Sequence, residues 1–260
     1  MVFELERVAI EVGGRLVLRD LSFSVSPGER LVVLGVNGSG KTTLMKLLDG
    51  LVSPQSGAVR YGPVSLDARR LGEPVFLRTF RSEVALLFQN VDAMLFNPTV
   101  ADEIAFGPRQ LGLPEIGTRV ARWADVFRVT PFLDRPPFEL SGGEKKRVAL
   151  AALLAIDPKV LLLDEPTANL DSASAAHLVD LLDSLTGVTV ITSTHNLSVA
   201  EELGSRALLL SPGGVGLLYD GPTSAVMSNE RLLIESGLAH VHRHAHATGV
   251  HAHFHVHDVD

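Results

Sequence analysis

The sequence Leu31-Val32-Val33-Leu34 leads directly into Gly35-Val36-Asn37-Gly38-Ser39-Gly40-Lys41-Thr42, and this stretch decides the fold. A continuous apolar run indicates a strand that is buried on both faces. The glycines that follow let the backbone curl so that its N–H groups face phosphate oxygens, and a helix that begins at Lys41 adds the positive end of its dipole. An ordinary glycine-rich turn is the alternative. It is disfavoured because a buried-strand pattern precedes the glycines and a helix pattern follows them.

Two pairs of adjacent residues, Lys41-Thr42 and Asp164-Glu165, are expected to act on a bound nucleotide. Lys41 is placed to reach the β and γ phosphates, and the Thr42 hydroxyl is placed to bind Mg²⁺. A second apolar run, Val160-Leu161-Leu162-Leu163, ends in Asp164-Glu165. Asp164 suits the coordination of Mg²⁺, and Glu165 is able to polarise an attacking water. An acidic pair that only caps the strand is the alternative, and the phosphate-binding loop makes it the weaker one.

A third motif, Leu140-Ser141-Gly142-Gly143-Glu144, opens a long apolar helix pattern. Ser141 and Glu144 have the spacing of a capping box, and a capped helix N-terminus presents its amides to an anion. A chain with one phosphate-binding loop has no obvious need for a second anion site. We therefore infer that this second site serves the nucleotide of another subunit.

Composition excludes several classes of protein. The 260 residues include 23 Lys+Arg and 30 Asp+Glu, a formal net charge of −7, which argues against a nucleic-acid partner. Cysteine is absent, and this excludes disulfide scaffolds, thiolate zinc sites and thiol catalysis. The longest apolar run, residues 148–156, is about half of the ~20 residues that a membrane-spanning helix needs. The N-terminus lacks a signal pattern, so we expect a cytoplasmic protein.

Short β-rich runs alternate with helical stretches, which predicts an α/β fold with a mainly parallel sheet and a β-rich N-terminal part. Strands are predicted at residues 7–12, 21–25, 30–34, 58–61, 84–88, 160–163, 188–192, 207–210 and 217–219, and helices at 41–48, 143–155 and 173–185. Between about residues 90 and 157, helix-like segments broken by Pro and Gly indicate an inserted helical subdomain. We expect one domain over residues 1–239 and a flexible tail over residues 240–260.

The predicted tail is rich in histidine. Of the 10 histidines of the chain, eight lie there: His240, His242, His244, His246, His251, His253, His255 and His257. An extended chain places residues i and i+2 on one face, so each half of the tail could bind a divalent ion such as Ni²⁺, Co²⁺ or Zn²⁺. A solvated tail with only accidental metal affinity is the alternative.

The order of the motifs resembles that of the ABC-type ATPases. The phosphate-binding loop is followed by Gln89, then by the LSGGE and LLLDEP motifs, then by Ala168-Asn169-Leu170-Asp171 and finally by His195. This resemblance extends from about Val8 to Pro222. It implies the ABC ATPase fold on a RecA-like P-loop NTPase core. It also implies a head-to-tail dimer with ATP between the P-loop of one subunit and the LSGGE signature of the other.

The resemblance also implies a role for each matched residue. Glu165 is the catalytic base, His195 holds the γ-phosphate and water, Gln89 senses metal and water, and Asp171 lies at the dimer seam. Thr42, Gln89 and Asp164 would hold Mg²⁺. The nucleotide-binding residues are Gly35, Val36, Asn37, Gly38, Ser39, Gly40, Lys41, Thr42, Thr43, Ser141, Gly142 and Gly143. Two positions depart from the family pattern. No aromatic residue stands near Val12 to stack on adenine, and Glu144 replaces the commoner Gln, as is familiar in the energy-coupling-factor branch.

Residues 87–108, LFQNVDAMLFNPTVADEIAFGP, resemble the corresponding stretch of energy-coupling-factor ATPases, above all those of cobalt and nickel importers. That resemblance implies a transmembrane coupling subunit, a substrate-specific membrane subunit and either a homodimer or a paralogous ATPase partner. The protein would lie at the cytoplasmic face of the cell membrane. Met94, Leu95 and Phe96 would then line a groove for a coupling helix, or else form a plain core segment.

Other functions fit less well. The substrate could be a vitamin or that of a generic importer, since this subunit does not contact it. A metal-storage protein or metallochaperone has only the histidine tail in its favour. ABC ATPases of DNA repair carry long coiled coils or zinc modules, and those of translation carry two P-loops. This chain has one P-loop and no long heptad pattern.

Overall fold

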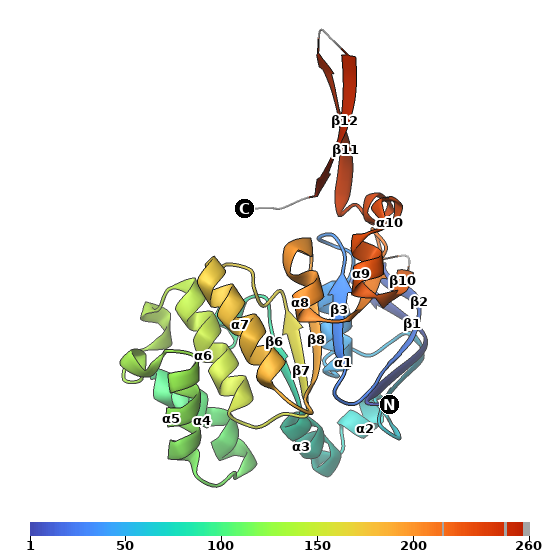
Figure 1. Cartoon of the computed structure of the whole chain (residues 1–260). Helices are drawn as coiled ribbons and strands as arrows, with labels where there is room; N and C mark the ends of the chain where they lie inside the picture. Colours follow the sequence, from blue (N-terminus) through green and yellow to red (C-terminus); the bar gives the residue numbers. More distant parts are fainter. Residues whose placement is uncertain (215, 247–248, 257–260) are drawn as a thin grey trace. The chain divides into compact units, whose positions relative to one another are not determined.

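The computed structural model describes residues 1–214, 216–246 and 249–256 of the chain (Figure 1). The chain divides into two compact units. Unit 1 comprises Met1–Asp67 and Ile191–Asp260, and unit 2 comprises Ala68–Val190. Strand β8 (Thr189–Thr194), in which every residue is buried, contains the point of division.

Unit 1 begins with an antiparallel sheet in the order β2-β1-β4-β5. Its strands are β1 (Phe3–Val12), β2 (Arg15–Val25), β4 (Ser56–Tyr61) and β5 (Val64–Ser65). The sequence predicts strands at 7–12 and 21–25, and both exist but begin earlier. The reason is that β1 and β2 pair with each other well beyond their clearest apolar pattern, from Phe3 opposite Val25 to Val12 opposite Arg15.

The second group of strands in unit 1 carries the phosphate-binding loop. It consists of β3 (Arg30–Leu34), β9 (Arg206–Leu210) and β10 (Leu217–Pro222). β3 runs parallel to β9, and β9 runs antiparallel to β10. The four apolar residues of β3, from Leu31 to Leu34, are completely buried. This confirms the prediction of a fully buried strand.

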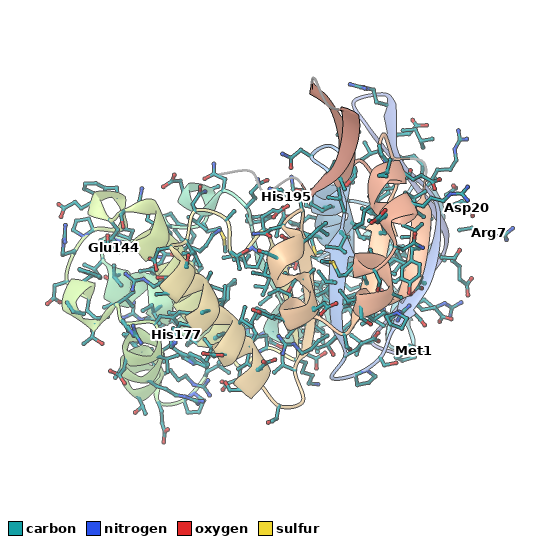
Figure 2. All side chains as sticks on the ribbon, turned by 45° about the horizontal axis from the view of Figure 1, so that its top comes forward. Met1, Arg7, Asp20, Glu144, His177 and His195 are labelled. Atoms are coloured by element: carbon teal, nitrogen blue, oxygen red, sulfur yellow. The ribbon has the colours of Figure 1, made fainter. Side chains whose placement is uncertain are left out.

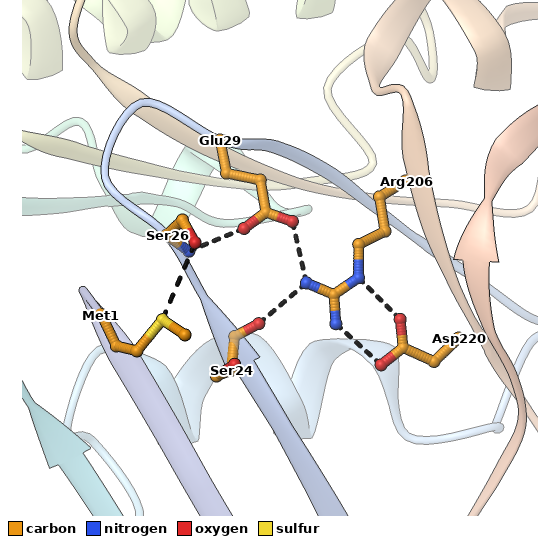
Figure 3. Close-up of polar contacts among 6 residues, drawn as sticks. All are labelled: Met1, Ser24, Ser26, Glu29, Arg206 and Asp220. Carbon is orange, nitrogen blue, oxygen red and sulfur yellow. Dashed lines mark hydrogen bonds and ion pairs between the residues drawn. The ribbon is translucent and has the colours of Figure 1, made fainter.

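Arg206 joins three parts of unit 1 (Figure 3). Its guanidinium donates to both carboxylate oxygens of Asp220, at 2.6 and 2.7 Å, and to Glu29 Oε1 at 2.8 Å. It also donates to the Ser24 carbonyl at 2.9 Å. The hydrogen bonds to Asp220 are the largest cause of the raised pKa of Arg206. The guanidinium therefore ties β9 to β10 and to the segment that leads into β3.

Helices complete unit 1. Helix α1 has the predicted bounds, Lys41–Leu48. The remaining helical elements are η4 (Leu197–Val199), α8 (Ala200–Leu203), α9 (Thr223–Met227) and α10 (Glu230–Glu235). The backbone then forms β11 (Ala239–His246) and β12 (Gly249–Val256), which pair antiparallel where the sequence predicts a flexible tail.

Unit 2 places helices around two parallel strands, β6 (Val84–Leu87) and β7 (Val160–Asp164). Its helical elements are α2 (Ala68–Leu71), α3 (Pro74–Glu83), η1 (Val91–Ala93), α4 (Val100–Leu111), α5 (Ile116–Val126), η2 (Thr130–Phe132), η3 (Pro137–Glu139), α6 (Gly142–Leu154) and α7 (Ser172–Ser184). Helices α4, α5 and α6 pack against one another (Figure 1). They fall within the stretch for which the sequence predicts a helical insertion.

Among the described residues, no helix is both long enough and apolar enough to cross a bilayer.

Candidate active site

The phosphate-binding loop lies between the buried end of β3 and the start of α1. Gly38 and Gly40 have φ angles of 82° and 100°, a backbone conformation that residues with side chains rarely adopt. A Cβ on Gly35 would collide with Ser39 Oγ, and one on Gly40 would stand 2.6 Å from Leu18 Cδ2. Gly35 and Gly40 therefore have no room for a side chain, whereas Gly38 has open space around it and is favoured by its positive φ angle alone.

Lys41 is 6% exposed, and its ammonium lies over the loop. Nζ donates to the carbonyl oxygens of Gly35, at 2.7 Å, and Val36, at 3.3 Å. These hydrogen bonds fold the long side chain back onto the backbone that precedes it. The charge is thus held at the same loop whose curved backbone suits a phosphate group.

Ser39 supplies a test of whether this loop fits an anionic ligand. Its side chain is 1% exposed, and Oγ has no hydrogen-bond partner among the described residues. A buried hydroxyl without a partner costs free energy, so such groups mark places where a ligand or water supplies the partner. The close-fitting glycines, the Lys41 ammonium and this hydroxyl together fit a bound phosphate.

His195 follows the last residue of β8 in unit 1 (Figure 2). The four residues before it, from Ile191 to Thr194, are buried, whereas His195 is half-buried. The next residue, Asn196, caps η4 by accepting a hydrogen bond from Ser198 N at 2.8 Å. A strand end and a capped turn therefore flank His195 and fix its backbone.

Three of the predicted residues stand at one edge of the parallel pair in unit 2. Leu87 of β6 is in register with Leu163 of β7, so the two strands end within one residue of each other. Gln89 is exposed and follows β6 by two residues, while Asp164 ends β7 and Glu165 follows it. Asp164 and Glu165 are only 1% and 3% exposed. The topology thus brings the amide and both carboxyl groups to a single sheet edge.

The LSGGE motif forms the N-terminus of α6 (Figure 2, which labels Glu144). Ser141 N donates to Glu144 Oε2 at 2.7 Å, and Glu144 N donates to Ser141 Oγ at 3.4 Å. The predicted capping box is therefore present. The Ser141 hydroxyl also donates to Glu144 Oε2, which is the largest cause of the lowered pKa of Glu144. A Cβ on Gly142 would meet no atom within 4 Å, so the turn is open.

Asp171 caps the next helix, α7. Its Oδ1 accepts from Ser174 N at 2.9 Å, and its Oδ2 accepts from the Ser174 hydroxyl at 2.8 Å. The bond from Ser174 N is the largest cause of the lowered pKa of Asp171. Within its own chain, Asp171 therefore fixes the turn between the loop after Glu165 and α7.

Lys146 and Glu103 are buried charged residues that the sequence does not single out. Lys146, on α6, donates from Nζ to the carbonyl oxygens of Glu165 at 2.9 Å and Ala168 at 2.6 Å. Glu103, on α4, accepts from Phe96 N at 2.9 Å and Asn97 N at 2.8 Å. Neither has a local sequence signal, because each residue reads as part of a charged helix face.

Comparison with known proteins identifies the family. Residues 18–168 match the family model of the ABC transporter. The chain belongs to the ABC transporter family. It is one of the ATP-hydrolysing cassettes of that family and resembles the ATPases of cobalt and nickel importers.

Three relatives show how far the similarity to ABC transporter proteins extends. The nickel import ATP-binding protein NikO of Rhodobacter capsulatus is 41% identical, over 89% of this chain and 93% of the relative. The cobalt import ATP-binding protein CbiO of the same organism is 41% identical, over 87% of this chain and 80% of the relative. The structure of CbiO1 from Clostridium perfringens, described as part of the ABC transporter complex CbiONQ, has a TM-score of 0.74 and 28% identity, and covers 91% of this chain and 94% of that one. The predicted ABC ATPase fold is confirmed.

Proposed function

We propose that this ABC ATPase powers an importer for nickel or cobalt ions. The observation that carries the ATPase role is the loop of residues 35–40, in which Gly35 and Gly40 have no space for a side chain and the Lys41 side chain lies over the backbone. The named relatives support the choice of ion, since two of them are a nickel and a cobalt import ATP-binding protein. The protein would act at the cytoplasmic face of the cell membrane, as a peripheral subunit.

The proposed nucleotide site is shared between two subunits, which are either two copies of this chain or this chain and a paralogue. ATP would contact residues 35–43 of one subunit and Ser141, Gly142 and Gly143 of the other. Two features of α6 support this. Its N-terminus is held by a capping box, and the open space at Gly142 lets an anion approach the backbone. Asp171 would lie at the seam between the subunits.

The proposed reaction is an in-line transfer of the γ-phosphoryl group to water. Glu165 would accept the proton of the attacking water, and His195 would orient that water and the γ-phosphate. The oxygen atoms of Thr42, Gln89 and Asp164 are of the kind that Mg²⁺ prefers, and these residues would hold the ion. When bound, Mg²⁺ neutralises charge on the phosphate oxygens.

The loop before α4 is the proposed contact for a transmembrane coupling subunit, which in turn would work with a substrate-specific membrane subunit. Phe96 is 65% exposed and packs edge-on against Phe106, with ring centroids 4.9 Å apart. Met94 and Leu95 are half-buried beside it in the sequence. An exposed pair of aromatic rings supports the partner groove rather than the plain core segment.

For the histidine-rich segment we propose binding of Ni²⁺, Co²⁺ or Zn²⁺, with a role in buffering or sensing the transported ion. The backbone register pairs His240 with His255, His242 with His253 and His244 with His251. Because alternate residues of a strand share a face, these six positions lie on the same face of the pair. His257 lies outside the described residues.

The ATPase role is tested by measuring phosphate release from the wild type and from Glu165→Gln. The variant should bind ATP and form a stable dimer in gel filtration while losing turnover. Full turnover in Glu165→Gln would contradict the assignment of the base.

The ion is tested by expressing the chain with its membrane subunits and measuring uptake of ⁶³Ni²⁺ and ⁵⁷Co²⁺ beside labelled vitamins. Uptake of a vitamin alone would favour the alternative of a vitamin importer. A variant that lacks residues 239–260 should keep its basal ATPase activity but change metal-dependent uptake. Identical uptake curves with and without the segment would contradict its proposed role.

A further inference from the structure

Lys146 is a buried cation that the proposed mechanism does not use. It lies on the second turn of α6, and only 3% of its surface is exposed. Its two hydrogen bonds end on backbone carbonyls, those of Glu165 and Ala168, and not on a carboxylate. Burial lowers the pKa of Lys146 to about 8, and the carboxylates of Glu165 and Asp164 oppose this shift. Burial of a charge costs free energy, so a residue that keeps one is expected to have a structural or functional role.

The two carbonyls bracket a loop with an unusual backbone. Glu165 and Asn169 have φ angles of 51° and 63°, and non-glycine residues rarely occupy this left-handed region. The loop has weak hydrogen bonds of its own. Ala168 N donates to the Glu165 carbonyl at 3.3 Å, and Leu170 N donates to the Thr167 carbonyl at 3.2 Å. Strained backbone persists only where surrounding contacts hold it. The ammonium of Lys146 supplies such contacts near both ends.

The helix that carries Lys146 is itself firmly anchored. Its first turn is closed by the Ser141–Glu144 capping box, and residues 148–151 further along it are buried. The loop that Lys146 holds carries the Glu165 side chain at one end and leads to the Asp171 cap of α7 at the other. Lys146 is therefore a fixed donor that reaches from the LSGGE helix to the segment between the base and the dimer seam.

We propose that Lys146 is a positioning residue for ATP hydrolysis: it holds the Glu165 backbone in its left-handed conformation and thereby aims the carboxylate at the attacking water. This inference rests on the proposed role of Glu165 as the base. It adds a second role for α6. The N-terminus of this helix would bind the nucleotide of the other subunit, while Lys146 on the same helix supports Glu165 of its own subunit. Lys146 does not touch the reacting atoms.

The test compares Lys146→Met, which keeps the length of the side chain but removes its donors, with Lys146→Arg, which keeps several donors. Lys146→Met should lower kcat by about tenfold to a hundredfold and change KM for ATP by less than about threefold, because misplacing a catalytic group affects the chemical step. Lys146→Arg should recover a large part of kcat. Lys159→Met is the matched control, since Lys159 lies in the same unit, is exposed and pairs with Glu83 at the surface.

A second readout does not depend on hydrolysis. Hydrogen exchange of the amides of Ala168 and Leu170 should accelerate in Lys146→Met, while exchange in the body of α6 stays as in the wild type. A variant with unchanged kcat, or with unchanged exchange in the loop, would overturn the proposal. So would a loss of kcat accompanied by faster exchange throughout unit 2, because that result means general destabilisation. If the wild type itself released no phosphate, the proposed ATPase function would be wrong. The hydrogen-exchange data would still show whether Lys146 stabilises the loop after Glu165.

Discussion

The buried Glu103 carboxylate holds the backbone that presents Phe96 to solvent. Glu103 is 4% exposed, and its Oε2 accepts from Phe96 N at 2.9 Å. The same oxygen accepts from Asn97 N at 2.8 Å. A carboxylate that accepts two backbone amides in a buried place fixes the local chain. The exposed ring therefore stands on a rigid loop.

The first prediction concerns this loop. Glu103→Ala should leave basal ATPase activity within about twofold of the wild type but reduce ATP-driven uptake by about tenfold or more, since it frees the loop that would meet the membrane subunit. Uptake and phosphate release are measured on the same preparations. Asp102→Ala serves as the control, because that neighbour lies in the first turn of α4 and pairs with Arg109 on the exposed side. Equal losses of uptake and of basal ATPase activity would contradict the assignment.

The second prediction distinguishes two glycines of the phosphate-binding loop. Gly38→Ala meets no neighbouring atom and carries only the strain of its positive φ, which we expect to cost about 1 kcal/mol of stability. Gly40→Ala adds a clash with Leu18 and stands at the start of α1. Its affinity for ATP should fall by about tenfold more than that of Gly38→Ala. Titration with a fluorescent ATP analogue measures both. Equal affinities would show that the clash is relieved without moving the loop.

The third prediction concerns the cap of α6. Glu144→Gln should keep both hydrogen bonds of the capping box and retain near wild-type stability, because Gln serves at this position as well as Glu. Glu144→Ala should lose the bond to Ser141 N and cost about 1 kcal/mol. Urea unfolding measures the difference. If the two variants were equally stable, the hydrogen bond from Ser141 N to the side chain of residue 144 would contribute nothing to stability.

The fourth prediction follows from the pKa of Lys146. Its value falls from 10.5 to about 8 on folding, so between these pH values the unfolded chain binds more protons at this position than the folded chain. Stability relative to Lys146→Met should therefore rise as pH increases from about 8 to about 10.5. The rise is at most about 3 kcal/mol. Urea unfolding of both proteins across this range measures it, and the other lysines cancel in the comparison. If the difference in the free energy of unfolding did not change with pH, burial of the Lys146 charge would not destabilise the folded chain.

Local sequence patterns determined the motifs and the elements that carry them. The apolar runs of β3 and β7, the glycines of the loop and the Ser141–Glu144 spacing are all short-range features, and each is present where predicted. Strand lengths were less predictable. β1 and β2 exceed their apolar patterns because pairing with a neighbour, rather than alternation alone, sets where a strand ends.

Tertiary structure alone decided which charged residues of the helices are buried and which distant backbone groups they contact. Lys146 and Glu165 are 19 positions apart in the sequence. The residues that flank each of them carry no pattern that predicts a contact between the two. Glu103 reads as one acid on an exposed helix face, yet folding buries it against the loop of Phe96. Residue type and spacing predict functional groups that lie together in a single turn or at the end of a single strand. Contacts between distant segments depend on how the helices pack, which short-range patterns do not encode. The sequence by itself therefore determined the motifs of the proposed site, and only the folded chain decided which distant contacts hold them in place.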